Sequence, residues 1–167
     1  CGSFKELQMP TPGFGVMQSN IQYFVRNGVK IFFEQCSGPM GSEFHQLRGY
    51  LAAKLLWDPE LDFDATMNDF LNGYYGAAGP IIREYIDLLR QNREASGEPF
   101  GIFNYTTDFA GSWLAPDKLR GYLAILDRAE AAVAGDTTLL RRVHYTRQPV
   151  QFAQLELSRT DPYGPEG

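Results

Sequence analysis

The middle of the sequence is dominated by a helical stretch, a stop and a second helical stretch. It runs from Tyr50 to Gly76 as YLAAKLLWDPELDFDATMNDFLNGYYG. A proline disfavours the α conformation in the residue before it, so Asp58-Pro59 predicts the end of the first helix. Ser42 is a candidate N-cap for the first helix, whose inward face is expected to hold Phe44, Leu47, Leu51 and Leu55. Asp62 supplies the side-chain oxygen of an N-cap for the second helix. Apolar residues recur at helical spacing on both sides of the stop, which predicts a chain built mainly of helices.

The same signals predict further helices downstream. Pro80 and Pro116 suit the first position of a helix, and Gly135-Asp136 forms a stop followed by a new N-cap. Helices are expected over residues 42–57, 62–76, 80–96, 116–135 and 137–158. Pro149 should kink the last helix or remove one of its backbone hydrogen bonds. The last two helices, joined by a tight turn, predict an antiparallel hairpin.

The segment before these helices has a different pattern. Ile21–Asn27 reads as a short helix that Gly28 ends. Val29–Phe33 (VKIFF) is a β-branched and aromatic run between turn residues, so we expect a buried strand there. A helix, a strand and then another helix is the order of an α/β unit.

Composition and charge exclude several classes of partner. The 167 residues are 44% hydrophobic and 21% charged, which is enough apolar material for a packed core. With a net charge of −5 and only one basic pair, Arg141-Arg142, the chain is not expected to bind nucleic acid or an anionic membrane. No apolar run reaches the roughly 18 residues of a membrane span. The two cysteines and two histidines form no zinc motif.

Three blocks of the sequence resemble a known bacterial family. They are Asn20–Gln35 (NIQYFVRNGVKIFFEQ), Glu43–Gly76 and Tyr122–Val143 (YLAILDRAEAAVAGDTTLLRRV). The chain is similar to the C-terminal portion of the domain of unknown function 4838 family, part of which is assigned to glycoside hydrolase family 163. The resemblance implies a (β/α)8 barrel with a helical C-terminal extension. It also implies a parent protein that acts as an endo-β-N-acetylglucosaminidase on complex N-glycans.

On this resemblance we expect a mainly α chain with two parts. Residues 1–57 would hold the last β/α elements of a TIM-like barrel, and residues 58–167 a C-terminal helical region of helix hairpins. A barrel needs eight strands, and only Val29–Phe33 reads as one, so the remainder of the barrel, or self-association, is an expected partner. The chain alone is expected to be inactive. No metal or organic cofactor is implied, and the resemblance suggests a periplasmic or cell-surface location.

Glu34 and Gln35 are the predicted substrate-binding residues. They follow the expected strand directly, where a barrel presents side chains to its substrate. Glu34 could accept hydrogen bonds from sugar hydroxyls, and Gln35 could both donate and accept them. By resemblance, the catalytic pair of carboxylic groups lies on earlier strands. No catalytic residue is therefore predicted in this chain, and its main role is expected to be a scaffold at the edge of the substrate cleft.

Other chemically active residues are explained more simply by structure. Glu43 and the acids Asp62 and Asp64 suit the first turns of helices, where the helix dipole favours negative charge. His45 is expected on a helix surface, and Trp57 as a packing anchor at a helix end. Tyr74-Tyr75 could stack on sugars, but at helical spacing the pair is expected to be core or a hydrogen-bonded helix end.

Three features near the expected barrel mouth and the chain start leave alternatives open. Cys36 could be a reactive thiol, although a partly buried ordinary cysteine is expected, and Ser37 beside it could lie at the barrel mouth. Cys1-Gly2-Ser3 could open a mature lipoprotein. We expect instead an internal boundary of a longer chain, because the resemblance has already begun by Phe4.

The aromatic loop Gly101–Trp113 could line a cleft or fill a gap between the helices and the barrel. The alternative function is a helical carbohydrate-binding or protein-interaction module without catalysis. That function predicts exposed aromatics in this loop. The hydrolase function predicts exposed apolar side chains on Val29–Phe33 and on one side of the helix Phe44–Trp57.

Overall fold

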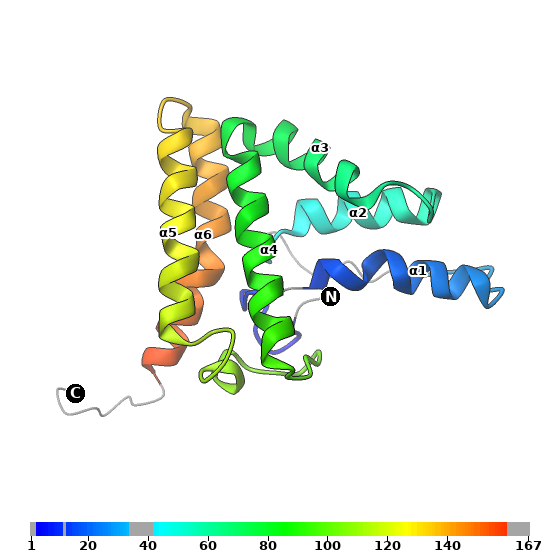
Figure 1. Cartoon of the computed structure of the whole chain (residues 1–167), viewed down its shortest axis with the longest axis horizontal. Coiled ribbons are helices and arrows are strands. Elements are labelled where there is room, and N and C mark those ends of the chain that lie inside the picture. The colour runs from blue at the N-terminus through cyan, green and yellow to red at the C-terminus, as the bar shows by residue number, and fades with distance from the viewer. Residues whose placement is uncertain (1–2, 12, 34–41, 160–167) are drawn as a thin grey trace.

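The computed structural model describes residues 3–11, 13–33 and 42–159 (Figure 1). These residues form six α-helices and three short 3₁₀ helices, and no strand occurs among them. The α-helices are α1 (Met17–Arg26), α2 (His45–Trp57), α3 (Phe63–Tyr75), α4 (Gly79–Ser96), α5 (Pro116–Ala132) and α6 (Thr137–Ser158). The 3₁₀ helices are η1 (Gly13–Val16), η2 (Gly76–Ala78) and η3 (Thr106–Phe109).

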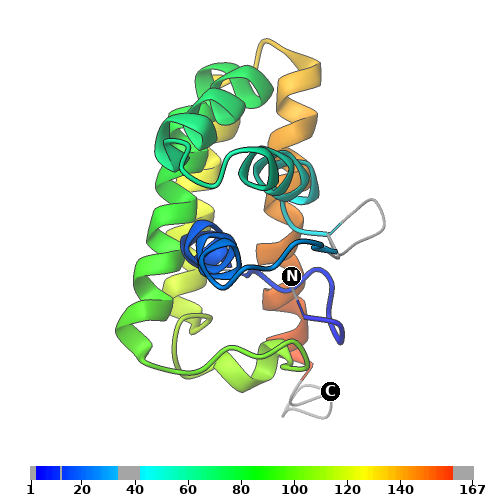
Figure 2. The ribbon, with the colours of Figure 1, turned by 90° about the vertical axis from the view of Figure 1, so that its right-hand side faces the viewer.

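Three long helices form the main body. Helices α4, α5 and α6 stand side by side and alternate in direction, and α5 packs against both of the others (Figure 1). Helix α3 leaves the start of α4 and slopes away from the body, while α1 and α2 project from it side by side (Figure 2). The predicted helix hairpin of α5 and α6 is therefore confirmed.

Local signals set the helix ends. The Asp62 side chain accepts a hydrogen bond from the backbone N–H of Ala65 (2.9 Å) and caps α3 as predicted. Asp136 caps α6 by accepting from the N–H groups of Thr138 (2.9 Å) and Leu139 (3.0 Å). Pro80 and Pro116 lie in the first turns of α4 and α5.

One hydrophobic core joins the helices. Its largest fully buried side chains include Trp113, Tyr85 and Tyr122. The Tyr122 hydroxyl donates to the Trp113 carbonyl (2.8 Å) and accepts from the Asn92 amide (2.9 Å), so its burial leaves no unsatisfied polar group. Burial raises the pKa of Tyr122 to about 12.

The N-terminal segment is held against the loop before η3. The N–H of Phe4 donates to the Ile102 carbonyl (2.7 Å), and the Ser3 hydroxyl donates to the Asn104 carbonyl (2.7 Å). The Glu6 carboxylate accepts from both the N–H (2.7 Å) and the hydroxyl (2.6 Å) of Thr106. These contacts join segments about a hundred residues apart in sequence.

The predicted strand Val29–Phe33 was wrong. These residues are extended but pair with no neighbour within the described ranges, and Ile31 and Phe33 are 91% and 86% exposed. The Val29 N–H instead bonds to the Phe24 carbonyl (3.1 Å), at the end of α1. A strand needs a partner to satisfy its backbone groups. The expected terminal β/α unit of a TIM-like barrel is therefore not shown, while the mainly α prediction is confirmed.

Two details of α2 also differ from prediction. Ser42 does not cap the helix, which begins at His45 after Phe44 in the left-handed conformation (φ 51°). Trp57 is no packing anchor, because its side chain is 91% exposed. The predicted inward face of α2 is confirmed by the burial of Leu47, Leu51 and Leu55.

Candidate functional site

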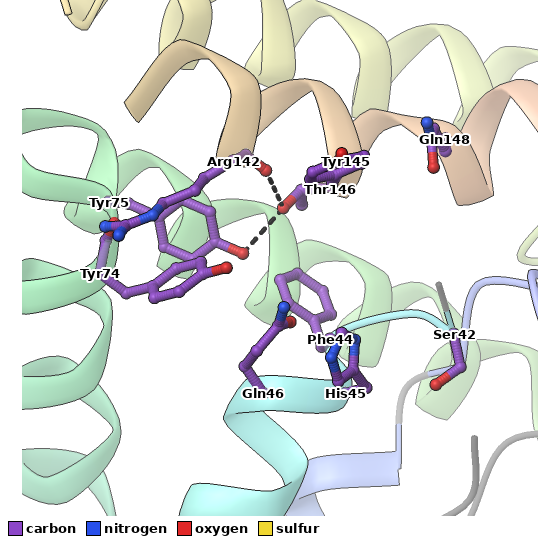
Figure 3. A pocket seen from close by; sticks show the side chains of 10 residues that line it. All are labelled: Ser42, Phe44, His45, Gln46, Tyr74, Tyr75, Arg142, Tyr145, Thr146 and Gln148. Atoms are coloured by element: carbon purple, nitrogen blue, oxygen red, sulfur yellow. Dashed lines mark hydrogen bonds between the residues drawn. The ribbon is translucent and has the colours of Figure 1, made fainter. Parts of the chain in front are cut away.

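A cavity of about 380 Å³ lies where α2 begins, α3 ends and α6 passes across both (Figure 3). We call it the α2–α3–α6 pocket. Its size falls in the range of about 300–1,000 Å³ typical of small-molecule sites. The lining residues are Ser42, Phe44, His45, Gln46, Tyr74, Tyr75, Arg142, Tyr145, Thr146 and Gln148.

The side of the pocket at α2 is set by an unusual backbone turn. Phe44 has a positive φ, which is uncommon for a residue with a bulky side chain. The turn places His45 and Gln46 in the first turn of α2, facing the pocket (Figure 3). Such strain persists only when the surrounding structure holds it in place.

A buried polar network beside Phe44 holds that turn. The Glu43 carboxylate accepts hydrogen bonds from the N–H (2.6 Å) and hydroxyl (3.0 Å) of Thr11 and from Arg48 Nη2 (3.3 Å). Tyr85 donates its hydroxyl to the other carboxylate oxygen (3.3 Å). Arg48 Nε also donates to the Glu43 carbonyl (3.1 Å). The network ties the residue before Phe44 to the N-terminal segment and to α4.

Burial dominates the electrostatics of Glu43. Desolvation raises the pKa of its carboxyl, and the charge of Arg48 with the hydrogen bonds of Thr11 and Tyr85 opposes that shift only in part. The helix-dipole explanation predicted for Glu43 was wrong, because the residue lies before α2 and not in its first turn. Glu43 is enclosed by its partners and forms a structural ion pair with Arg48.

The opposite wall of the pocket is a hydrogen-bonded contact between α3 and α6. The Thr146 hydroxyl donates to the Arg142 carbonyl (3.1 Å), so the Tyr75 hydroxyl is the donor to Thr146 Oγ1 (2.8 Å). Burial is the main cause that raises the pKa of Tyr75 above its ordinary range. Tyr75 is therefore a neutral, fixed part of the wall, consistent with its predicted place in the core.

Arg142 is oriented by its neighbour Tyr74. Its Nη1 donates to the Tyr74 carbonyl (2.6 Å) at the end of α3, and its guanidinium lies 4.3 Å from the centre of the Tyr74 ring. The ring of Tyr74 is in turn stacked on Phe70, with centroids 5.1 Å apart. A guanidinium held by a carbonyl and an aromatic face keeps donors available for a planar anion.

The pocket combines aromatic surface, amides and positive charge. Tyr145 lies 58% exposed at its rim, and Gln46 and Gln148 supply groups that both donate and accept. Among the described residues, the lining contains no aspartate or glutamate. These residues can bind a polar ring compound, and none of them is a carboxylic acid suited to acid–base catalysis.

Comparison with family models places the chain. Residues 2–87 match the model of the Domain of unknown function (DUF4838). The chain belongs to the DUF4838 family. The match confirms the predicted family and covers the first two of the three resembling blocks. It ends inside α4, so both the third block, Tyr122–Val143, and the α6 residues of the pocket lie beyond it. No curated protein and no solved structure matches the chain significantly.

The structure places only some of the residues predicted from the DUF4838 resemblance. Glu34 and Gln35, the predicted substrate-binding pair, lie outside the described residues, as do Cys36 and Ser37. Ser42 is the first described residue after that segment, and it lines the α2–α3–α6 pocket.

The aromatic loop Gly101–Trp113 divides between two environments. Phe109 and Trp113 are buried in the core, whereas Phe103 and Tyr105 are exposed. The loop therefore both fills space between elements and shows two aromatic rings to solvent.

The α6 residues of the pocket were missed by sequence reasoning. Arg142, Tyr145 and Gln148 fall on one face of α6, but the sequence does not show that α3 and α2 pack against that face. The tyrosines at the end of α3 were the only available signal, and Tyr74 does line the pocket, half-buried.

A second surface of this DUF4838 chain is apolar and exposed. We call it the apolar surface. It lies on α1, on the extended segment 29–33 and at the end of α2. Its most exposed side chains are Tyr23, Val25, Ile31, Phe33, Leu56 and Trp57. A shallow cavity of about 170 Å³ between α1 and the end of α2 is lined in part by Phe24, Phe32 and Leu56. Single exposed apolar residues are normal on a monomer, whereas large contiguous apolar patches are typical of interaction sites.

Two kinds of feature are absent from the described parts of the chain. No three His, Cys, Asp or Glu side chains gather there as metal ligands. None of the helices described is both long and apolar enough to span a bilayer.

Proposed function

We propose that the chain is the C-terminal part of a glycoside hydrolase-like protein that acts on N-acetylglucosamine-containing glycans. The parent would be of the endo-β-N-acetylglucosaminidase type, acting on complex N-glycans. Within it, α1–α6 brace the barrel, and Glu34 and Gln35 contact the glycan at the edge of the substrate cleft. The family resemblance also suggests a periplasmic or cell-surface location for the parent.

The observation that carries this proposal is the apolar surface. Ile31 and Phe33 are almost fully exposed and lead directly into Glu34-Gln35. Apolar side chains of this size favour burial by about 1.5–3 kcal/mol each. The rest of a barrel packed on this surface would bury them and place Glu34 beside the substrate.

A glycan-release assay on a complex N-glycoprotein tests the proposal. It compares this chain with a parent protein extended N-terminally to the whole barrel, each as wild type and as Glu34→Ala. We expect release by the parent alone. We also expect release to fall roughly tenfold in Glu34→Ala, since a lost charged hydrogen bond costs about 1.5–3 kcal/mol.

A matched control separates a substrate contact from a general loss of charge. Glu94→Ala removes an exposed carboxylate at the far end of α4 and should leave release unchanged. A folded parent that releases no glycan would refute the hydrolase assignment. Equal release by wild type and Glu34→Ala would remove Glu34 from the substrate site.

A second candidate function has its own observation. Phe103 and Tyr105 are exposed, and the ring of Phe4 lies 6.1 Å from that of Phe103. Exposed aromatic rings can stack on sugars, as a non-catalytic carbohydrate-binding module requires. Glycan binding by the isolated chain that is lost in the Phe103→Ala, Tyr105→Ala double variant would favour this alternative.

A further inference from the structure

We propose that the α2–α3–α6 pocket binds a sugar that carries a carboxylate, a sialic or uronic acid, with Arg142 as its counter-ion. The inference rests on the proposed function, because the carboxylate would be the part of the glycan substrate that this chain recognises. It assigns Arg142, Tyr145 and Gln148 to binding and gives none of them a catalytic role.

The pocket contains the positive charge of Arg142. Six other arginines of the described chain contact a carboxylate of the protein; they are Arg48, Arg83, Arg90, Arg128, Arg147 and Arg159. Arg142 makes no such ion pair within the described residues, and neither do Arg26, Arg93, Arg120 and Arg141. Of these five arginines, Arg142 is the one that lines the pocket, where it is half-buried. Because the described lining residues include no acid, an anionic ligand would meet one fixed positive charge and no opposing one among them.

Arg142 is held in a fixed orientation by Tyr74. One of its nitrogens is occupied by the Tyr74 carbonyl, and its plane is held near the Tyr74 ring. The guanidinium has five N–H donors, so a second edge stays available for a carboxylate. A side chain already fixed in this way loses little rotamer freedom when a ligand binds.

The rest of the lining suits a sugar better than a simple anion. Gln46 projects from α2 toward Tyr74 and Tyr75, and Gln148 lies on the opposite side in α6 (Figure 3). Amide groups on two sides can pair with hydroxyl groups that donate and accept. The exposed ring of Tyr145 offers an apolar face to a pyranose ring.

Binding of two matched pairs of sugars to the chain tests the inference. The pairs are sialyllactose with lactose, and methyl β-glucuronide with methyl β-glucoside; within each pair one member carries a carboxylate. Protein amide signals followed by NMR give both the affinity and the place of binding. We expect saturable shifts at α6 and the start of α2 for an acidic member, and none for its neutral partner. Added salt should weaken the binding.

Neighbouring arginines provide the control. Arg142→Gln should weaken acidic-sugar binding roughly tenfold, the effect of one charged bidentate pair. Arg141→Gln removes the same charge from the exposed neighbouring position, outside the lining, and should change the affinity less than about twofold. If Arg142→Gln fails to fold, the Tyr145→Ala, Gln148→Ala double variant replaces it, because both side chains are exposed.

Each outcome decides the inference. Binding of sialyllactose alone, or of the glucuronide alone, would support it and identify the acid. Equal binding of neutral sugars, binding unaffected by Arg142→Gln, or no binding at all would overturn it. Glycan release by the parent together with no acidic-sugar binding would reject the pocket and leave the hydrolase proposal intact. Acidic-sugar binding by the chain without glycan release by the parent would support the pocket and reject the hydrolase proposal.

Discussion

Arg48 and Glu43 form a buried ion pair, with Arg48 Nη2 3.3 Å from Glu43 Oε2 and both side chains almost closed off from solvent. The same Arg48 nitrogen donates to the carbonyl (2.9 Å) and the hydroxyl (2.5 Å) of Thr11. The pair therefore fixes the N-terminal segment, the strained Phe44 turn and the start of α2 with one set of contacts.

Arg48→Ala should destabilise the chain strongly. It leaves the buried Glu43 carboxylate without its counter-charge, a change that typically costs about 3–5 kcal/mol. Urea unfolding gives the free energy of unfolding. Arg159→Ala, which breaks an exposed pair with Glu156, is the control and should cost at most about 0.5 kcal/mol. Similar losses in the two variants would mean that the Glu43–Arg48 pair is not buried as described.

The free energy of unfolding should depend on pH in a way that reports the titration of Glu43. Burial raises the pKa of its carboxyl above the ordinary 4.5, so above pH 4.5 the folded chain holds a proton that the unfolded chain has released. Since the folded state then binds more protons, stability contributed by Glu43 is present below pH 4.5 and is lost as pH rises through the folded pKa. The loss proceeds at up to about 1.4 kcal/mol per pH unit.

Comparison with Glu43→Gln isolates that contribution, because glutamine does not titrate. The difference in unfolding free energy between wild type and Glu43→Gln should shrink as pH rises from 4.5 and then level off. A difference that grows over this interval would show that the Arg48 charge outweighs desolvation and that the pKa of Glu43 is lowered.

Gly79→Ala should be destabilising, because α3 and α4 meet too closely for a side chain there. A Cβ at Gly79 would lie 2.7 Å from the Leu71 carbonyl oxygen and 2.8 Å from the Asn72 side-chain oxygen. Forcing the two backbones apart typically costs about 1–3 kcal/mol. Thermal unfolding checks this against Gly121→Ala in α5, where the added Cβ would meet no atom within 4 Å beyond its chain neighbours and the backbone of its own helix. The control should gain up to about 1 kcal/mol from helix propensity. A stabilised Gly79→Ala variant would contradict the close approach.

The helices could be predicted from sequence because their ends are set locally. Asp62 and Asp136 act on N–H groups two or three residues away, and a proline acts on its own turn. Such effects depend only on residues that are close together in the sequence. The expected starts of α3, α5 and α6 agree with the structure for this reason, whereas α5 ends at Ala132, before the predicted stop at Gly135.

The strand could not be tested by local reasoning. Val29–Phe33 has the residue types of a buried strand, yet a strand exists only when another segment satisfies its backbone. Nothing in the described chain does so, and the apolar side chains are exposed instead. The same limitation explains Trp57, whose burial depends on what covers the end of α2.

The pocket could not be predicted from the sequence either, because its lining residues come from helices that are far apart in the sequence. Arg141 and Arg142 are adjacent and chemically identical, and only the packing of α6 on α3 distinguishes them. Tyr74 and Tyr75 were correctly read as a helix end, but their partners in α6 could not be known. Contacts between distant helices depend on the whole fold.

Trp57 provides a direct test of the partner expected on the apolar surface. The chain has two tryptophans, and Trp57 is 91% exposed whereas Trp113 is fully buried. In the chain alone, iodide should quench Trp57 fluorescence and leave Trp113 unaffected, and Trp57→Phe should abolish the quenched component. In the parent extended to the whole barrel, Trp57 should become protected, because covering an apolar side chain of this size is favourable by about 1.5–3 kcal/mol. Equal quenching of Trp57 in both proteins would show that the barrel does not pack on this surface.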